Sequence, residues 1–224
     1  MGKLIAIGGG CNGGDFDIQL EEKIRALIPN KHPQVVFIPY ASTDFEDNFH
    51  EFKQIYESSG CVVNLLMPGK ENLLVQADLI YIGRGWTIPL LKKLIDTNVI
   101  PILKSAMDKG AIIAGFSAGA NCLFTLAGSN EEGIGYTLIE GLGLINGCII
   151  SHYNYDDRAA AFHAFLSEKN LTGIGLEDHT MMVVENNTAT IYSSKANSKG
   201  YIIKTKNNSL VINPIGKEEL VLPL

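Results

Sequence analysis

The sequence lacks several features that would place it in a specialised class of protein. Its four cysteines form no CxxC pair and have no metal-ligand spacing, so we expect small, buried, reduced side chains and no disulfide framework. No block of basic residues is present, and 18 Lys and Arg against 24 Asp and Glu leave a net charge of −6. Such an acidic chain is a poor partner for nucleic acids or anionic membranes.

Long apolar segments are missing as well. No stretch approaches the roughly 18 apolar residues that a membrane-spanning helix needs. The start of the chain carries only a short apolar run, at residues 4–7, which is too brief for the apolar region of a signal peptide. These absences predict a cytoplasmic protein with no membrane partner.

Short apolar runs alternate with amphipathic segments along most of the chain. Strands are predicted at residues 4–7, 35–39, 62–66, 79–83 and 111–116, and helices at 16–28, 45–59, 89–96, 105–109 and 117–126. Continuous apolar strands separated by helices are typical of a parallel sheet with helices on both faces. We therefore predict an α/β fold, a three-layer sandwich around a mostly parallel sheet.

From about residue 175 the chain becomes richer in β-forming residues. Short segments at 181–185, 190–194, 201–206 and 210–213 are punctuated by two asparagine pairs, at 186–187 and 207–208. Such pairs favour tight turns, so C-terminal β-hairpins are expected. Because no linker composition or internal repeat interrupts the sequence, residues 1–224 are predicted to form a single domain.

Glycine is abundant, with 23 in 224 residues, and its most informative cluster is the GxSxG sequence from Gly115 to Gly119. The motif follows a predicted strand and precedes a predicted helix, a context in which the serine hydroxyl projects above the carboxyl edge of the sheet. Small neighbours are needed because a Cβ would collide with adjacent backbone. Amides at the helix start, such as that of Ala118, can stabilise developing negative charge. Ser117 is the predicted nucleophile.

A serine nucleophile needs a base, and the sequence offers five histidines. His152 follows a strand-like run at 147–151, and the carboxyl edge of an open α/β sheet is where catalytic groups gather. His179, just before another predicted strand, is the alternative base. The remaining histidines are expected on the surface or within a helix: His32, His50 and His163.

A carboxylate would complete a triad by holding the imidazole tautomer and stabilising the imidazolium. Asp178 stands in a loop near a strand edge, and Glu177 lies one position earlier. The other candidate acids occupy more polar segments that we expect to be solvated: Glu131, Glu132, Asp156 and Asp157. Asp178 is therefore the preferred acid, with the others left open.

Two further glycine loops follow predicted strands. In the loop at 83–87, the amide of Gly85 is a candidate second oxyanion donor, with Arg84 and Trp86 at the mouth of the site. The loop at 8–14 contains a GxGxxG match, but no acidic residue ends the following strand, where a dinucleotide fingerprint requires one. Nucleotide binding is disfavoured, and this loop is interpreted as backbone that lines the same crevice.

Four segments together resemble the aspartyl dipeptidase and cyanophycinase family of serine peptidases. They are residues 83–87 with Leu90 and Leu91, 115–121, 151–153 and 175–178. The order serine, histidine, acid distinguishes this family from α/β-hydrolases, in which the acid precedes the histidine. The resemblance covers most of the chain and implies a flavodoxin-like or class I glutamine amidotransferase-like fold.

The resemblance also implies roles for individual residues. Ser117 matches the family's nucleophile and His152 its general base, while Gly85 and Ala118 match the residues that give the oxyanion amides. The family implies no metal and no organic cofactor, and its substrates are small peptides. The oligomeric state stays open.

The acids and the loop residues match the family less directly. The family's late acid falls on Asp178, with Glu177 as the alternative one position earlier, and a second acid implicated in the family is best matched by Glu132. In the glycine loop, Arg84 replaces the family's middle glycine and Trp86 its asparagine. A bulky cationic and aromatic pair at the mouth is expected to change which substrates fit.

Substrates of the family carry an acidic aspartyl residue at the amino terminus or are aspartyl-arginine polymers. The resemblance therefore implies a cationic group that holds a carboxylate, and Arg84 and Arg158 are the candidates for a bidentate grip. We accordingly predict a serine peptidase that acts on short peptides with an acidic first residue.

Two other functions remain open. An esterase of the α/β-hydrolase kind would use Ser117 with partners in the opposite chain order: Asp156 or Asp157, then His163 or His179. A non-catalytic Rossmann-type module would instead bind a ligand through the loop at 8–14.

Overall fold

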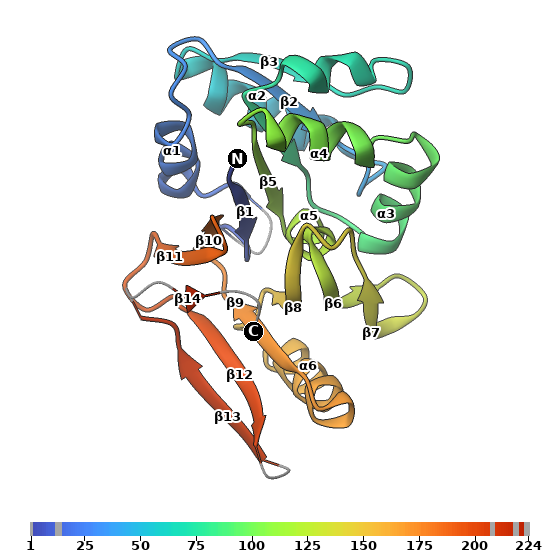
Figure 1. The fold of residues 1–224 in the computed structure, drawn as a ribbon, viewed down its shortest axis with the longest axis vertical. Coiled ribbons are helices and arrows are strands. Elements are labelled where there is room, and N and C mark those ends of the chain that lie inside the picture. Colours follow the sequence, from blue (N-terminus) through green and yellow to red (C-terminus); the bar gives the residue numbers. More distant parts are fainter. Residues whose placement is uncertain (1, 12–14, 207–208, 217–219, 222–224) are drawn as a thin grey trace.

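Two β-sheets organise the chain, and helices pack between and around them (Figure 1). The computed structural model describes residues 2–11, 15–206, 209–216 and 220–221. The expected α/β class with largely parallel strands is confirmed. The sequence indicated one such sheet, whereas the described strands divide between a larger and a smaller one.

The larger sheet has the strand order β14-β11-β10-β1-β5-β4-β2-β3. Its strands are β1 (Leu4–Ile7), β2 (Gln34–Ile38), β3 (Val62–Leu65), β4 (Leu79–Ile82), β5 (Ile112–Phe116), β10 (Thr180–Glu185), β11 (Thr188–Ser193) and β14 (Leu220–Val221). The strands from β1 to β3 in this order are parallel, and the other three add an antiparallel edge. β1, β4 and β5 are buried throughout, which explains their uninterrupted apolar sequences.

The smaller sheet has the order β13-β12-β9-β8-β6-β7. Its strands are β6 (Phe124–Glu131), β7 (Gly135–Glu140), β8 (Ile145–Ser151), β9 (Thr172–Leu176), β12 (Gly200–Lys206) and β13 (Ser209–Pro214). The helix predicted at 117–126 is too long, because the chain leaves its helix at Leu123 and enters β6. β7 escaped prediction because its residues are all partly or fully exposed and form no apolar run.

Helices pack on one face of the larger sheet, between the two sheets, and on the smaller sheet. Their bounds are α1 (Ile18–Ala26), α2 (Glu46–Ser58), α3 (Thr87–Asp96), α4 (Ile100–Asp108), α5 (Ala118–Leu123) and α6 (Asp156–Lys169), with a 3-10 helix η1 (Glu71–Gln76). α1 and α2 cover one face of the larger sheet, where Phe16, Phe52 and Tyr81 share one apolar cluster. α3, α4 and α5 belong to a second cluster that joins both sheets, and α6 packs on the smaller sheet through Phe162 and Leu166.

The predicted C-terminal hairpins form, but in different sheets. β10 and β11 pair around Asn186 and Asn187, whose φ angles of 51° and 63° lie in the left-handed region that tight turns use. β12 and β13 form the second hairpin, which lies at the edge of the smaller sheet beside α6 (Figure 1). The turn predicted at 207–208 lies outside the described residues.

The carboxyl ends of several strands meet at one place, and this positions the candidate site. β1, β5 and β4 are parallel neighbours, so Gly8, Ser117 and Gly83 emerge at the same edge of the larger sheet. The backbone N–H of His152, just after β8, donates to the Gly8 carbonyl at 3.0 Å. The smaller sheet therefore delivers its own carboxyl end to the same edge.

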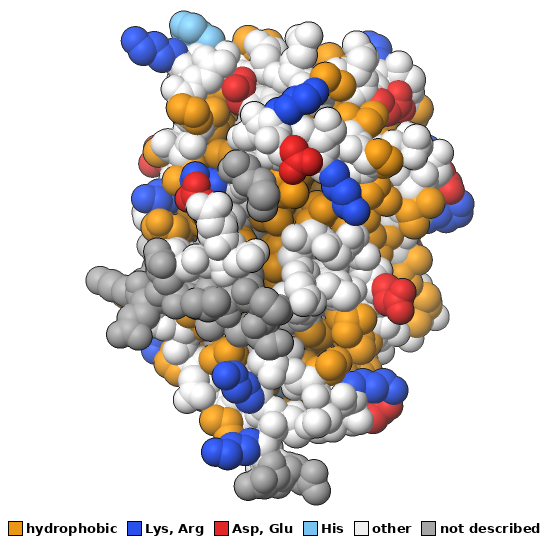
Figure 2. All heavy atoms as spheres, in the orientation of Figure 1, with side chains coloured by type: hydrophobic (Ala, Val, Ile, Leu, Met, Phe, Trp, Pro, Cys, Tyr) orange, Lys and Arg blue, Asp and Glu red, His pale blue; other side chains and the backbone are white. Residues whose placement is uncertain are grey.

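The surface and the cysteines add two further observations. None of the described helices combines the length and the apolar character needed to cross a membrane. On the face shown in Figure 2, basic and acidic side chains are interspersed. The four cysteines are free, and three of them are buried as expected. Cys11 is only partly buried, contrary to that expectation, because it lies in the loop that follows β1.

Candidate active site

Ser117 occupies a sharp turn between β5 and α5. Its φ of 54° and ψ of −106° lie outside the regions that side-chain-bearing residues normally adopt. Its N–H donates to the Ile7 carbonyl at 3.0 Å, and its carbonyl accepts from Asn121 N–H at 2.9 Å. A Cβ at Gly115 would overlap the Gly119 carbonyl, so the glycines of GxSxG are needed for this close approach. The local sequence therefore produces the turn that was expected for a nucleophile.

His152 lies between Ser117 and Asp178. Its Nε2 is 2.8 Å from Ser117 Oγ, and its Nδ1 is 2.6 Å from Asp178 Oδ1. An ionised carboxylate can only accept, so the proton belongs on Nδ1, and Nε2 then accepts from the serine hydroxyl. The imidazole is buried. This is the hydrogen-bond pattern in which an imidazole can remove a serine proton.

Asp178 is held from both sides. Asn154 donates from Nδ2 to Oδ2 at 3.1 Å and accepts from the Asp178 N–H at 2.8 Å. Burial raises the pKa of Asp178, but the hydrogen bond and charge of His152, the Asn154 amide and the charge of His179 together lower it below its ordinary value. A Cβ at Gly9 would overlap Asp178 Oδ1 and crowd His152, so the end of β1 must carry glycine here.

The other candidate acids lie elsewhere. Glu177 turns away from the imidazole and accepts from Lys199 N–H through Oε2 at 2.7 Å. Glu132 is exposed and lines a separate hollow beside Trp86. Asp157, at the start of α6, accepts from the Tyr136 hydroxyl at 2.6 Å. Among these carboxylates, Asp178 is the one that contacts the imidazole.

The other histidines do not reach Ser117 either. His179, the alternative base, pairs through Nδ1 with Asp17 Oδ2 at 2.6 Å. His163 binds the Tyr153 hydroxyl at 2.7 Å, and burial lowers its pKa. The remaining two are exposed, as expected: His32 and His50. The constellation required by an α/β-hydrolase-like esterase is therefore not assembled in the described structure.

A cavity of about 250 Å³ opens in front of the serine. It is lined by Ser117 and His152 together with all the predicted oxyanion and substrate-binding residues: Gly85, Ala118, Arg84, Trp86 and Arg158. Gly85 has a φ of 143°, and a Cβ there would overlap the Ala41 carbonyl. The loop therefore packs tightly against Ala41, and its Gly85 lines the same cavity as Ser117.

Glu131 anchors this glycine loop from β6. Its carboxylate accepts from the N–H groups of Thr87 and Ile88, each at 3.1 Å, and from the Ser129 hydroxyl at 2.6 Å. The carboxylate therefore satisfies the first amides of α3, whose N-cap Trp86 supplies no side-chain hydrogen bond. Sequence reasoning weighed Glu131 only as a solvated acid, whereas it is 4% exposed.

Arg84 and Arg158 give the cavity its cationic groups. The guanidinium of Arg84 donates from Nη2 to Asn48 Oδ1, and its Nε is buried without a hydrogen-bond partner among the described residues. Arg158 lines this cavity and an adjoining one that also contains Tyr155 and His152. The charge of a bound carboxylate would be favoured between these two groups.

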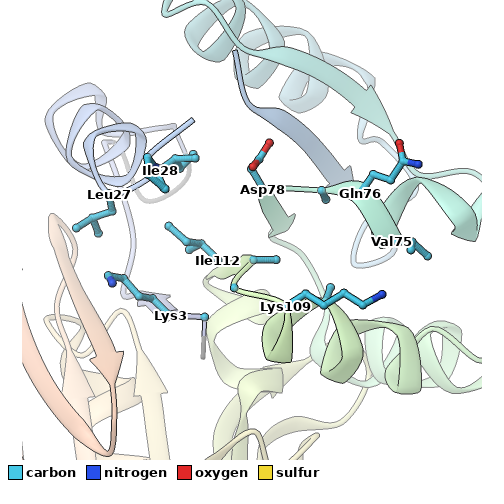
Figure 3. Close-up of a pocket in the computed structure, with 14 residues that line it drawn as sticks. Lys3, Leu27, Ile28, Val75, Gln76, Asp78, Lys109 and Ile112 are labelled. Atoms are coloured by element: carbon cyan, nitrogen blue, oxygen red, sulfur yellow. The ribbon is translucent and has the colours of Figure 1, made fainter. Parts of the chain in front are cut away.

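A larger cavity, of about 630 Å³, lies at the amino ends of the strands (Figure 3). Lys3, Asp78 and Lys109 line it beside apolar residues such as Ile112. Its described lining contains no serine, cysteine or histidine, so this cavity offers neither a nucleophilic hydroxyl or thiol of these kinds nor an imidazole base. The smaller cavity is therefore the candidate active site, although it is not the largest hollow.

One cluster has the composition of a metal site. Cys11, Asp17 and His179 bring ligand atoms within 4.8 Å of one another. Asp17 and His179 are already hydrogen-bonded to each other, and Lys195 Nζ lies 2.9 Å from the Nε2 of His179. A cation would meet an ammonium group there, so the cluster is better suited to hydrogen bonding than to metal coordination.

Sequence reasoning missed two contributors. Asn154 stands two residues after His152, but nothing in the local sequence shows that its amide meets Asp178. Asp17 lay inside the helix predicted at 16–28, whereas it is the N-cap of α1, and an aspartate at a helix start is a recognisable capping signal. Its bond to His179, 162 positions away, is visible only in three dimensions.

Comparison with known proteins gives concordant results. The sequence model of Peptidase family S51 matches residues 4–192. The chain is 28% identical to "Uncharacterized peptidase YgaJ" of Bacillus subtilis (strain 168), over 96% of this chain and 97% of that protein. It is 26% identical to "Probable alpha-aspartyl dipeptidase" of Drosophila melanogaster, over 72% of this chain and 73% of that protein.

A solved structure shares the fold. The crystal structure of a peptidase from an acI-B1 Actinobacterium superposes with a TM-score of 0.72 at 21% identity, and the match covers 99% of this chain and 97% of the other.

Proposed function

The chain belongs to peptidase family S51, and we propose that it hydrolyses short peptides through an acyl-enzyme with Ser117 as nucleophile, His152 as base and Asp178 as the orienting acid. The observation that carries the proposal is the continuous hydrogen-bond chain from Asp178 Oδ1 through His152 to Ser117 Oγ, with contacts of 2.6 and 2.8 Å. Ser117 and His152, at one end of these hydrogen bonds, line a cavity that Gly85 and Ala118 also line.

The residues support the following sequence of steps. His152 Nε2 takes the hydroxyl proton while Ser117 Oγ forms a bond to the peptide carbonyl carbon. The amides of Gly85 and Ala118 donate to the resulting oxyanion. The imidazolium then protonates the leaving amine, and the peptide C–N bond breaks. Water, deprotonated by His152, releases the acyl group by the reverse sequence.

Asp178 supports the base without contacting the substrate. Its carboxylate keeps the proton on His152 Nδ1 and stabilises the imidazolium that forms during each half-reaction. The lowered pKa of Asp178 keeps this carboxylate ionised at neutral pH.

For the substrate we propose dipeptides that begin with an acidic, aspartyl residue. A cavity of about 250 Å³ suits a small peptide better than a folded chain. Arg84 and Arg158 supply the positive charge that an aspartyl carboxylate needs. The name of the Drosophila relative, "Probable alpha-aspartyl dipeptidase", is in keeping with this specificity.

The test is a panel of aspartyl, isoaspartyl and neutral dipeptides assayed with the wild type and with Ser117→Ala. We expect the wild type to release amino acids from the aspartyl dipeptides and Ser117→Ala to be nearly inactive. Equal, background-level release by both proteins across the whole panel would overturn the proposal.

Removal of the arginine charges tests the preference for an acidic first residue separately from the catalytic mechanism. Arg158→Gln should raise the KM for an aspartyl dipeptide about tenfold or more, because a charge-assisted hydrogen bond is worth about 1.5–3 kcal/mol. The KM for an alanyl dipeptide with the same second residue should change little. Arg84→Gln is the companion variant. If either variant changes both KM values equally, that arginine is structural rather than specific.

A further inference from the structure

His179 follows Asp178 directly in the chain, yet its side chain points to a separate group of residues. Its Nδ1 lies 2.6 Å from Asp17 Oδ2, and its Nε2 lies 2.9 Å from Lys195 Nζ. Its backbone is equally constrained: the N–H donates to the Gly9 carbonyl at 2.9 Å, and the carbonyl accepts from Ser194 N–H at 3.0 Å. The residue next to the triad acid is therefore fixed at four points.

Asp17 is the centre of this arrangement. Its Oδ1 caps α1 by accepting from Gln19 and Leu20 N–H at 3.1 and 3.4 Å, and its Oδ2 accepts from the Ser194 hydroxyl at 2.5 Å as well as from His179. Burial raises the pKa of Asp17, but these hydrogen bonds outweigh burial and lower it. An ionised Asp17 thus joins α1, the end of β11 and the turn that carries Asp178.

Both ring nitrogens of His179 have a charged neighbour. Asp17 can only accept, so Nδ1 carries the proton, and Nε2 then accepts from the Lys195 ammonium. Cys11, partly buried, and Asp178 are the other titratable groups beside this cluster. The imidazole lies between one carboxylate and one ammonium group, on a residue whose backbone is left-handed with a φ of 64°.

The Asp17–His179 pair is linked to Asp178 and His152 in two ways. His179 is covalently adjacent to Asp178, and its N–H donates to Gly9, the position at which a Cβ would overlap Asp178 and crowd His152. We propose that Asp17 and His179 are positioning residues that set the orientation of the Asp178 carboxylate toward His152. This inference rests on the proposed function, because it assigns a role in the same reaction.

Two variants separate positioning from folding. His179→Asn keeps a residue that tolerates positive φ but shortens the side chain so that it loses Asp17. Asp17→Ser keeps a preferred cap for α1 but loses the reach to His179. His50→Asn, on the exposed face of α2, is the matched control for the histidine change.

The rate at which a fluorophosphonate labels Ser117 measures the reactivity of the serine without knowledge of the natural substrate. We expect His179→Asn and Asp17→Ser to be labelled about 10- to 100-fold more slowly than the wild type, since a displacement of about 1 Å can cost this much. The pH of half-maximal labelling should also fall, because a misplaced carboxylate stabilises the imidazolium less. His50→Asn should match the wild type. All assays are run well below the unfolding temperature of each variant.

A double variant gives the sharpest outcome. If the pair acts through Asp178, Asp178→Asn with His179→Asn should be labelled hardly more slowly than Asp178→Asn alone. Multiplicative losses, or wild-type labelling with an unchanged pH profile in both single variants, would overturn the inference. Absence of labelling in the wild type would overturn the proposed function itself, and with it the premise of the inference.

Discussion

Backbone conformation at single residues singles out the site as clearly as the side chains do. Among the described residues, the non-glycine residues with positive φ are four asparagines and three others. The asparagines occupy turns, where this conformation costs them little. The three others are Ser117, His152 and His179, with φ angles of 54°, 55° and 64°. Such strain persists only where the surrounding structure imposes it, and here it is concentrated at the proposed reacting groups and their neighbour.

The hydrogen-bonded serine and histidine should behave as one unit. We expect Ser117→Ala and His152→Ala each to lower kcat more than about a thousandfold, and the double variant to be hardly worse than either. The reason is that neither group can transfer the proton alone. Steady-state kinetics on the best dipeptide of the panel measures this. Independent, multiplicative losses would argue against a shared proton transfer.

At the scale of elements, the position of the oxyanion loop depends on a strand from the other sheet. α3 begins immediately after Trp86, and its first amides bond to Glu131 of β6. A third bond joins the same two elements, between the Thr87 and Ser129 hydroxyls at 2.9 Å. The glycine loop is thus held by the larger sheet at one end and by the smaller sheet at the other.

Removal of this anchor should impair catalysis and stability together. Glu131→Ala leaves the N–H groups of Thr87 and Ile88 without their partner, at a cost of about 1–3 kcal/mol for the buried N–H of Thr87. We expect a lower Tm and, at temperatures where the variant is folded, a kcat lower by about tenfold or more because Gly85 shifts. Glu132→Ala, an exposed neighbour, is the control. A wild-type kcat in folded Glu131→Ala would contradict the anchoring role.

At the scale of the whole molecule, one buried acid joins α1, α2 and β4. Glu21 accepts hydrogen bonds from the Tyr56 and Tyr81 hydroxyls at 2.7 and 2.8 Å. Burial raises its pKa to about 7 from an ordinary value of 4.5, despite these bonds. The folded protein therefore retains a proton that the unfolded chain releases. The stability contributed by Glu21 is fully present below pH 4.5 and is lost as the pH rises through 7.

The corresponding substitution should stabilise the protein in a pH-dependent way. Glu21→Gln mimics the protonated carboxyl, so it avoids a cost of about 3 kcal/mol at pH 8 for a difference of about 2.5 pH units. We expect a Tm several degrees above the wild type at pH 8 and little difference at pH 5, as measured by thermal unfolding. Glu22→Gln, exposed on α1, is the control. An equal change in Tm at both pH values would contradict the role of ionisation.

Much of the fold was predictable because the relevant signals are local. The strand at Leu4–Ile7 was predicted to the residue, and most parallel strands within one or two residues, since burial on both faces demands an apolar run. α4 begins at Ile100, earlier than predicted, because Pro101 fits the first turn of a helix and does not end it. The division into two sheets was not predictable, because the partner of a strand is not encoded in its own residues.

The sequence by itself determined the turn at Ser117, because steric contacts among Gly115, Ser117 and Gly119 leave few conformations open. It also determined the short set of histidines and acids that could serve this serine. Only the tertiary structure decided that Asp178 rather than Glu177 meets His152, and that Glu131 rather than Glu132 is buried. Glu177 and Asp178 lie where the chain turns after β9, and β6 ends between Glu131 and Glu132, so the choice between neighbours depends on which distant elements lie on each side of the chain.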